Sequence, residues 1–310
     1  MPQPSFQPGH RMMDSPHKIS VTLRSVLKQA ADMLSSNRIE RARLEAELLL
    51  AHILELRKED LIIHPNQELT DPQEENFQQL IERRCRKEPL AYIVGQREFW
   101  SLEFKVTPKV LIPRPETEGV VERLLHLAGD EAYEKAIRIL DVGTGSGILA
   151  IVAALEFPKA RVTAVDNSDD ALEVARGNAL RHQVVDRIEI FEMDLMRGWN
   201  LPPNDCYDYI LSNPPYIPSK ELEQLMPDVR DYEPRAALDG GPDGLACYRC
   251  IVANAFPYLK PGGHLIFEVG DDQAGLVKQT LQAHGGWNEI EVIQDLSGRD
   301  RVVSTRRALG

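Results

Sequence analysis

The sequence predicts an α/β protein in which a doubly wound sheet of seven strands follows a small bundle of helices. From residue 137 onward, short runs of apolar and β-branched residues alternate with helical stretches, as in parallel sheets whose strands are joined by helices. Before residue 88, apolar residues recur at the spacing of one helix face instead. Ligands of doubly wound sheets bind at the carboxyl ends of the strands, so the residues after each strand are the candidate site.

The N-terminal part is predicted to begin with a tail and two helices. Residues 1–20 are polar and contain prolines, so we expect a flexible tail in which Met1, Met12 or Met13 could be the start. Thr22 is placed to cap the first helix, whose apolar residues share one face: Leu23, Val26, Leu27, Ala30 and Leu34. In the second helix, residues 41–55, we expect an inward face of Leu44, Leu48 and Ala51.

A third helix is predicted to begin with Asp71 as its N-cap and Pro72 as its first helical residue. Its inward face is predicted to consist of Phe77, Leu80 and Ile81. Together these helices form a domain of residues 21–88.

The pattern then changes to that of a sheet. Residues 92–106 contain aromatic and β-branched residues around Gly95 and Ser101, which predicts a hairpin within a linker of residues 89–113. The remaining residues, 114–310, form the sheet domain. Its predicted strands are residues 137–142, 161–166, 187–192, 207–212, 263–269, 289–294 and 302–306.

Composition excludes several classes of protein. The net charge of −12 over 310 residues argues against a broad phosphate-binding surface, hence against direct binding of nucleic acid. No run approaches the roughly 18 apolar residues of a membrane span. Four cysteines (Cys85, Cys206, Cys247 and Cys250) suit a reducing compartment. Cys247 and Cys250 lack the second pair of a zinc site, so we expect a cytoplasmic monomer without metal.

A glycine-rich turn follows the first predicted strand: Asp141-Val142-Gly143-Thr144-Gly145-Ser146-Gly147. Glycines allow a tight turn there and let a ligand approach the backbone. A dinucleotide fingerprint would place its third glycine at position 148, where this chain has Ile148. An acid followed by alternating glycines resembles instead the S-adenosylmethionine loop of class I methyltransferases, with Gly143, Thr144, Gly145, Ser146 and Gly147 as cofactor-binding residues.

Acids also follow the next two predicted strands. Asp166 ends the second, where a carboxylate can accept hydrogen bonds from both hydroxyls of a ribose. Asp194 and Leu195 follow the third, in a position to border an adenine. Asp194 could equally be a carboxylate that caps a loop. The glycine turn and the residues after three further strands face the same edge of one sheet, so they form a set.

Ser212-Asn213-Pro214-Pro215-Tyr216 follows the fourth strand. Two prolines end the strand and stiffen the turn, and the residue before a proline is extended. Such a rigid turn can hold a planar NH2 group, because Asn213 Oδ1 and the Pro214 carbonyl accept its two hydrogens while Tyr216 covers its face. A Pro-Pro turn with a packing tyrosine is the alternative. Together with the glycine turn, Asn213, Pro214, Pro215 and Tyr216 are the candidate catalytic residues.

Asn-Pro-Pro-Tyr beside such a loop resembles methyltransferases that act on nitrogen conjugated to a π system. Over nearly its whole length the chain resembles the peptide-chain release-factor glutamine methyltransferase family (PrmC/HemK). The matching stretches are Tyr-Ile-Val-Gly at 92–95, Glu-Phe at 98–99, Val-Leu-Ile-Pro-Arg-Pro-Glu-Thr-Glu at 110–118, Ser-Asn-Pro-Pro-Tyr-Ile-Pro at 212–218, Tyr-Glu-Pro-Arg-Ala-Ala-Leu at 232–238 and Gly-Gly-Pro-Asp-Gly-Leu at 240–245. Leu195 departs from family members that have an aromatic residue there.

The resemblance implies methyl transfer from S-adenosylmethionine to the side-chain amide nitrogen, N5, of the glutamine in the Gly-Gly-Gln tripeptide of class I release factors. The helical domain would dock this protein partner. Arg114 and Glu116 would either bind the release-factor backbone or brace the hinge between domains. The stretch from Tyr232 to Arg235 would be a lid or a surface loop.

Three alternatives remain at this point. Ribosomal-protein glutamine methylases share the Asn-Pro-Pro-Tyr half but usually differ at the stretch that contains Arg114 and Glu116. An adenine-N6 nucleic-acid methylase would be expected to carry a basic face and a recognition insertion, which this acidic chain lacks. A binding module without activity is disfavoured by the intact stretch from Asn213 to Tyr216.

Overall fold

The computed structural model describes residues 22–201 and 207–309, and the chain divides into two compact units, Met1–Arg86 and Lys87–Gly310. The predicted tail, residues 1–20, lies outside the described residues, and so does Cys206.

The N-terminal unit is helical. Its helices are α1 (Leu23–Ser36), α2 (Ala42–Leu54), α3 (Lys58–Ile63) and α4 (Asp71–Cys85). Thr22 caps α1 as predicted: its N–H donates to Ser25 Oγ over 3.0 Å and its hydroxyl accepts from Ser25 N. The predicted inward face of α1 is buried. A pair of side chains, Arg84 and Glu45, joins α4 to α2 with Nε and Oε2 2.5 Å apart.

Two predictions in this unit are wrong in detail. Leu48 is 37% exposed, and α2 buries Ala46, Leu49, Leu50 and Ala51 instead of a face that contains Leu44 and Leu48. Apolar residues surround most of this helix, so their spacing alone does not select the inward side. The N-cap of α4 is Thr70 instead of Asp71, since Thr70 N donates to Gln73 Oε1 over 3.0 Å.

The second unit opens with a short helix, α5 (Leu90–Val94), before the hairpin of β1 (Gln96–Phe99) and β2 (Leu102–Lys105). The predicted hairpin therefore begins four residues later than the pattern from residue 92 indicates. Pro89 precedes the helix and Gly95, with φ of 80°, ends it. A short apolar run fits helix and strand equally; the helix places Tyr92 so that its hydroxyl donates to the Val110 carbonyl over 2.7 Å.

Seven strands of the described residues form one sheet in the order β5-β4-β3-β6-β7-β9-β8. The strands are β3 (Arg138–Val142), β4 (Arg161–Asp166), β5 (Ile188–Glu192), β6 (Tyr207–Ser212), β7 (Leu259–Glu268), β8 (Trp287–Gln294) and β9 (Asp300–Arg307). All seven predicted strands are confirmed. The sheet is not wholly parallel, however, because β9 is antiparallel to both β7 and β8. Five residues between β8 and β9 leave no room for a crossover helix.

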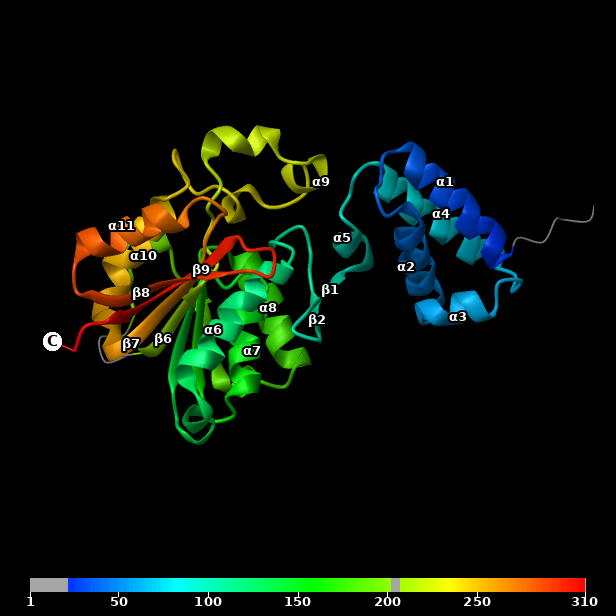
Figure 1. Cartoon of the computed structure of the whole chain (residues 1–310). Coiled ribbons are helices and arrows are strands. Elements are labelled where there is room, and N and C mark those ends of the chain that lie inside the picture. Colours follow the sequence, from blue (N-terminus) through cyan, green and yellow to red (C-terminus); the bar gives the residue numbers. More distant parts are fainter. Residues whose placement is uncertain (1–21, 202–206, 310) are drawn as a thin grey trace, which may run out of the picture. The chain divides into compact units, whose positions relative to one another are not determined.

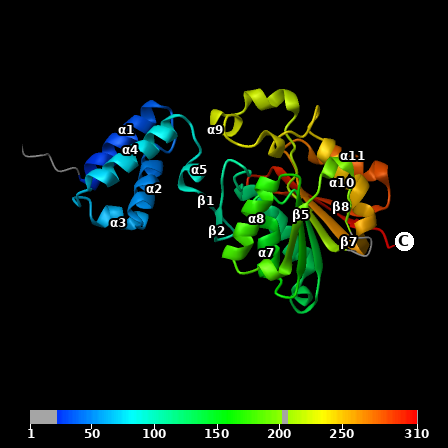
Figure 2. The same cartoon turned by 180° about the vertical axis from the view of Figure 1, so that it is seen from behind.

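Helices cover both faces of this sheet (Figures 1 and 2). On one face lie α6 (Glu118–Ala128), α7 (Ile148–Glu156) and α8 (Asp169–Arg181); on the other lie α10 (Ala246–Ala255) and α11 (Ala274–His284). The first group buries Val120 and Ile151 against Ile139, whereas the second buries Tyr248 and Val277 with Leu140. This is the doubly wound architecture of the prediction.

Shorter helices complete the described part of the chain. They are η1 (Pro115–Thr117), η2 (Asp130–Glu134), η3 (Val185–Arg187), η4 (Leu195–Arg197), η5 (Ser219–Gln224), α9 (Pro227–Arg230), η6 (Arg235–Ala237) and η7 (Phe256–Tyr258). Within residues 22–201 and 207–309, no helix has both the length and the apolar character needed to cross a membrane.

Candidate active site

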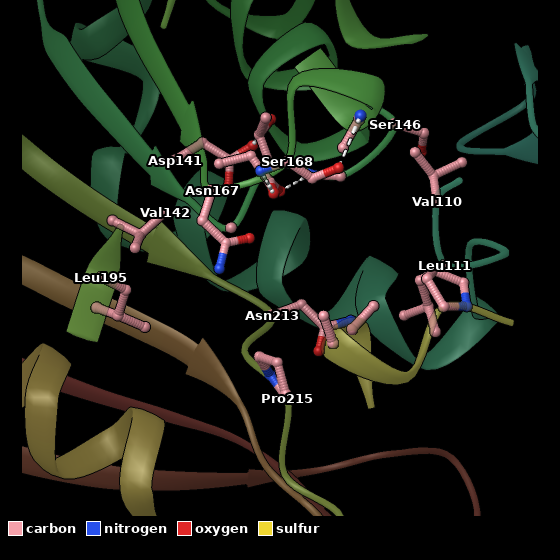
Figure 3. Close-up of a pocket in the computed structure, with 18 of the residues that line it drawn as sticks. Val110, Leu111, Asp141, Val142, Ser146, Asn167, Ser168, Leu195, Asn213 and Pro215 are labelled. Atoms are coloured by element: carbon pink, nitrogen blue, oxygen red, sulfur yellow. Dashed lines mark hydrogen bonds between the residues drawn. The ribbon is translucent and has the colours of Figure 1, made fainter. Parts of the chain in front are cut away.

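A cavity of about 340 Å³ lies at the carboxyl ends of β3, β4 and β6, where a doubly wound sheet binds its ligands. Figure 3 shows Asp141, Ser146 and Ser168 on one side of it and Asn213 and Pro215 across from them, with Leu195 and Leu111 at the flanks. The predicted site residues among those that line it are Gly143, Thr144, Gly145, Ser146, Asp166, Leu195, Asn213 and Pro215. Six others do not line it in the described structure: Arg114, Glu116, Gly147, Asp194, Pro214 and Tyr216.

The glycines of the turn after β3 have two different roles. Gly145 has φ of 54°, and a Cβ atom added there would meet no atom within 4 Å, so its backbone is open to the cavity. Gly147 has φ of 85°, and its Cβ would lie 3.1 Å from Ile151 and 3.2 Å from Ala175. Gly147 therefore lets α7 and α8 pack closely, which explains why it does not line the cavity.

Asp141 ends β3 beneath this turn and was not among the residues predicted to bind. Its side chain is fully buried, and one oxygen, Oδ2, accepts from Thr144 Oγ1 over 2.6 Å and from Ala150 N over 3.1 Å. The other oxygen, Oδ1, is buried and has no hydrogen-bond partner in the described residues. Burial raises the pKa of Asp141 to about 7. A buried, unpaired acceptor at a cavity wall suits a cationic donor from a ligand.

Asp166 supports the turn from the end of β4. Oδ2 accepts from Gly145 N over 2.9 Å and Oδ1 accepts from Ser168 N over 3.1 Å. Burial raises the pKa of its carboxyl, although these backbone N–H groups act in the opposite direction. Each oxygen retains a second lone pair, so the carboxylate can accept from a ligand while it holds the turn.

Asp194 has the structure of a capping residue. Its Oδ1 accepts from Met196 N over 2.9 Å and its Oδ2 lies 3.1 Å from Arg197 Nε. The neighbouring side chains of Met193, Leu195 and Met196 line the cavity instead. This stretch therefore presents an apolar wall, which the sequence pattern of an acid after a strand does not reveal.

Asn213 follows β6 and lines the cavity (Figure 3). Its Nδ2 donates to Thr117 Oγ1 over 3.0 Å. The acceptor of the amide, Oδ1, is consequently the end available to a ligand. Thr117 lies in η1, 96 residues earlier in the chain, and was not predicted to be part of the site.

Tyr216 turns away from the cavity into a buried network. Its hydroxyl donates to Glu268 Oε1 over 3.3 Å, and Thr117 Oγ1 donates to Glu268 Oε2 over 2.6 Å. Glu268 ends β7 and is 1% exposed. Its burial raises its pKa to about 7. Glu268 was also missed, because nothing in its local sequence distinguishes it from other residues of a buried strand.

The backbone of Tyr216 is enclosed by the loop of residues 240–244. A Cβ atom on Gly240 would lie 2.7 Å from Tyr216 Cα, and one on Gly244 would lie 2.4 Å from the Tyr216 carbonyl oxygen. That same oxygen accepts from Gln273 Nε2 over 2.7 Å. These contacts fix the turn that carries Asn213.

Arg114 and the stretch from Tyr232 to Arg235 are joined by an ion pair within this unit. Arg114 Nη2 lies 2.6 Å from Glu233 Oε1, and the Glu233 side chain is 1% exposed. Burial raises the pKa of Glu233, which Arg114 opposes. Pro234 and two alanines after it line the cavity, so the pair holds a wall of the cavity in place. Glu116 is exposed.

Known proteins match both units. Residues 25–95 match the family model of the PrmC N-terminal domain, and residues 124–227 match that of the methyltransferase small domain. A release factor glutamine methyltransferase of Geobacter sulfurreducens is 43% identical over 92% of this chain and 96% of its own length. That of Moorella thermoacetica is 44% identical over 91% and 97%, and that of Coxiella burnetii is 44% identical over 86% and 92%.

Solved structures share the fold at low identity. A methyltransferase from Pyrococcus furiosus has a TM-score of 0.51 at 19% identity and covers 73% of this chain and 98% of its own. The hMettl16 catalytic domain, solved in complex with MAT2A 3′UTR hairpin 6, has a TM-score of 0.55 at 15% identity and covers 78% and 83%. At these identities the likeness shows the fold alone.

The methyltransferase fold and domain imply S-adenosylmethionine as the cofactor, and the cavity fits it. S-adenosylmethionine has a cationic amino acid end, a ribose diol and an adenine. The cavity offers an unpaired buried carboxylate oxygen on Asp141, a second carboxylate on Asp166 and an apolar wall at Leu195. With relatives 43–44% identical over nearly the whole of both chains, this chain belongs to the family of release factor glutamine methyltransferases.

Proposed function

We propose that the chain transfers the methyl group of S-adenosylmethionine to the side-chain amide nitrogen, N5, of the glutamine in the Gly-Gly-Gln tripeptide of class I peptide chain release factors. The observation that carries this proposal is the orientation of Asn213, whose donor is bound by Thr117 so that its acceptor is presented at the cavity. The side-chain amide of a glutamine has two N–H donors, so its nitrogen can be held by a hydrogen-bond acceptor such as Asn213 Oδ1.

The difficulty of this reaction lies in the nucleophile. An amide lone pair is delocalised, so the nitrogen is a poor base and a poor nucleophile. S-adenosylmethionine supplies a sulfonium that already activates the methyl group. The residues of this chain therefore act by positioning and by stabilising charge, as the nitrogen becomes positive while the N–C bond forms and the S–C bond breaks.

Asn213 and Pro214 would hold the acceptor nitrogen. Asn213 Oδ1 would accept one N–H, and the carbonyl of Pro214, a buried residue that does not itself line the cavity, would accept the other. Both bonds would strengthen as positive charge develops on nitrogen. Pro215 lines the cavity beside them, and Tyr216 secures the turn from behind. The amide proton leaves late, to water, since no strong base is needed once the nitrogen is cationic.

Other residues would bind the cofactor. Asp141 Oδ1 would accept from its amino group and Asp166 from its ribose hydroxyls, while Leu195 would border the adenine. The backbone from Gly143 to Ser146 approaches the ligand, as the open position at Gly145 permits. The N-terminal unit would dock the release factor, a role that rests on family likeness alone.

The proposal is tested with purified release factor, DNA and labelled S-adenosylmethionine, with the position of the label found by mass spectrometry. Label on the Gly-Gly-Gln glutamine of the release factor is the expected result, and a release factor with glutamate in that position should accept none. Label on ribosomal protein alone, or on adenine, would contradict the proposal. Removal of residues 1–86 should weaken methylation of the intact release factor while cofactor binding persists.

A further inference from the structure

Four polar groups from separate parts of the chain form one hydrogen-bonded row beside the cavity, which Thr117 and Asn213 line. In order they are Tyr216, Glu268, Thr117 and Asn213, joined by contacts of 3.3, 2.6 and 3.0 Å. Glu268 and Thr117 are 1% and 0% exposed. Only Asn213 of this row has been assigned a contact with substrate.

The row has a defined direction because each hydroxyl has a single proton. Thr117 donates its proton to Glu268 Oε2, so toward Asn213 it can only accept. The neighbour that satisfies this acceptor is Asn213 Nδ2. With its NH2 turned to Thr117, Asn213 must present Oδ1 on the other side of its amide plane.

We propose that Glu268 and Thr117 are positioning residues, and that the Glu268 carboxylate, acting through the Thr117 hydroxyl, fixes the side of the Asn213 amide that meets the substrate nitrogen. The inference rests on the proposed function, since a substrate NH2 group donates hydrogen bonds and therefore requires the acceptor Oδ1 at the cavity. It assigns a specificity role to two residues that do not themselves contact the reacting atoms.

Protonation of Glu268 would reverse the row. A carboxylic acid can donate to Thr117, which would then donate to Asn213 and turn its NH2 toward the substrate NH2, donor against donor. The groups that face Glu268 are Arg301 on β9, Tyr216 after β6, Tyr248 on α10 and Glu116 in η1. Burial raises the pKa of Glu268 most, to about 7, while the hydrogen bond from Thr117 and the charge of Arg301 lower it and Glu116 raises it. Turnover should therefore rise with pH through about 7.

The matched variants are Thr117→Val, Thr117→Ser and Glu268→Gln. Valine keeps the shape of threonine but removes the hydroxyl, so kcat should fall about tenfold to a hundredfold with unchanged cofactor affinity. Serine restores the hydroxyl and should recover most of that loss. The glutamine side chain can accept a hydrogen bond from Thr117 but does not titrate. The kcat of Glu268→Gln should therefore be constant between pH 6 and 8, and it should be higher than the kcat of Thr117→Val.

A second measurement does not depend on release factor. In protein labelled with ¹⁵N at asparagine, the Asn213 side-chain NH2 signal, identified by its absence in Asn213→Ala, should shift as Glu268 titrates in the wild-type chain. It should not shift in Thr117→Val or Glu268→Gln. Wild-type kcat and the wild-type pH profile in both variants, or an Asn213 signal that titrates in all of them, would overturn the inference. If wild-type enzyme leaves the release factor unlabelled, the proposed function fails instead. The NMR titration then still tests whether Glu268 sets the orientation of the Asn213 amide through Thr117.

Discussion

The two sides of the cavity are held together by different kinds of contact. On the cofactor side, the hydrogen bonds of Asp141 and Asp166 reach residues 2, 3, 9 and 21 positions away in the sequence. On the side of Asn213, the corresponding separations are 52, 96 and 151 residues. The cofactor side is thus the turn after β3 together with the end of the next strand in the chain, β4, whereas the other side exists only when η1, β6 and β7 have come together.

This difference indicates how each side should respond to substitution. A change at the local turn should affect cofactor binding and little else. A change at Asn213 or in its supporting row should leave the cofactor bound and affect methyl transfer, because the row acts on the orientation of one amide.

The largest effect is expected for Asn213→Ala. The substrate NH2 loses a positioned acceptor that strengthens in the transition state, which costs on the order of 10² to 10³ in kcat. S-adenosylmethionine affinity and melting temperature should change little, as measured by calorimetry and by thermal unfolding. Normal turnover of release factor by this variant would remove Asn213 from the proposed mechanism.

Asp166→Ala should have the opposite effect to Asn213→Ala: cofactor affinity should fall while kcat stays nearly unchanged. The loss of two charge-assisted hydrogen bonds to the ribose should weaken cofactor binding by about 2–4 kcal/mol, and Gly145 N loses its acceptor as well. Isothermal titration measures the affinity. At saturating cofactor, kcat should be close to that of wild type; a low kcat there would mean that the two sides of the cavity are coupled.

Arg114→Ala tests the contact that holds one wall of the cavity. Glu233 would lose the cation beside its buried carboxyl, at a cost of about 1–2 kcal/mol, since Arg114 is itself 31% exposed. Faster hydrogen exchange in residues 232–239 is the expected result. Arg249→Ala, which breaks an exposed pair with Asp243 in the same part of the chain, is the control and should have little effect. Equal exchange in both variants would contradict the bracing role.

Tyr216→Phe should have the smallest effect. It removes one of the hydroxyls that donate to Glu268, over 3.3 Å, and leaves the contact from Thr117 in place. We expect a loss of about threefold in kcat, the size of one modest hydrogen bond. Tyr216→Ala should be much worse, because it also removes the ring that packs behind the turn. Similar losses in the two variants would place the function of Tyr216 in its hydroxyl.

The linear pattern of residues determined the architecture and the cofactor side. Alternation of apolar runs with helices located all seven strands, since a buried strand and an amphipathic helix each need a local spacing of apolar residues. Glycines and acids at strand ends placed Gly145 and Asp166 at the cavity, because each follows or ends a strand that the local pattern predicts, and the two meet across only 21 residues.

Tertiary structure decided what depends on partners far apart in the sequence. The inward side of α2 is settled by packing. Thr117 and Glu268 lie 151 residues apart. Thr117 belongs to the matching stretch at 110–118 and Glu268 to no such stretch, and neither position in the sequence reveals the contact between them. Spacing along the chain places Asn213 at the end of a strand, but it carries no information about which way an amide points. That direction is set by the hydroxyl that meets it, so only the folded chain determines it.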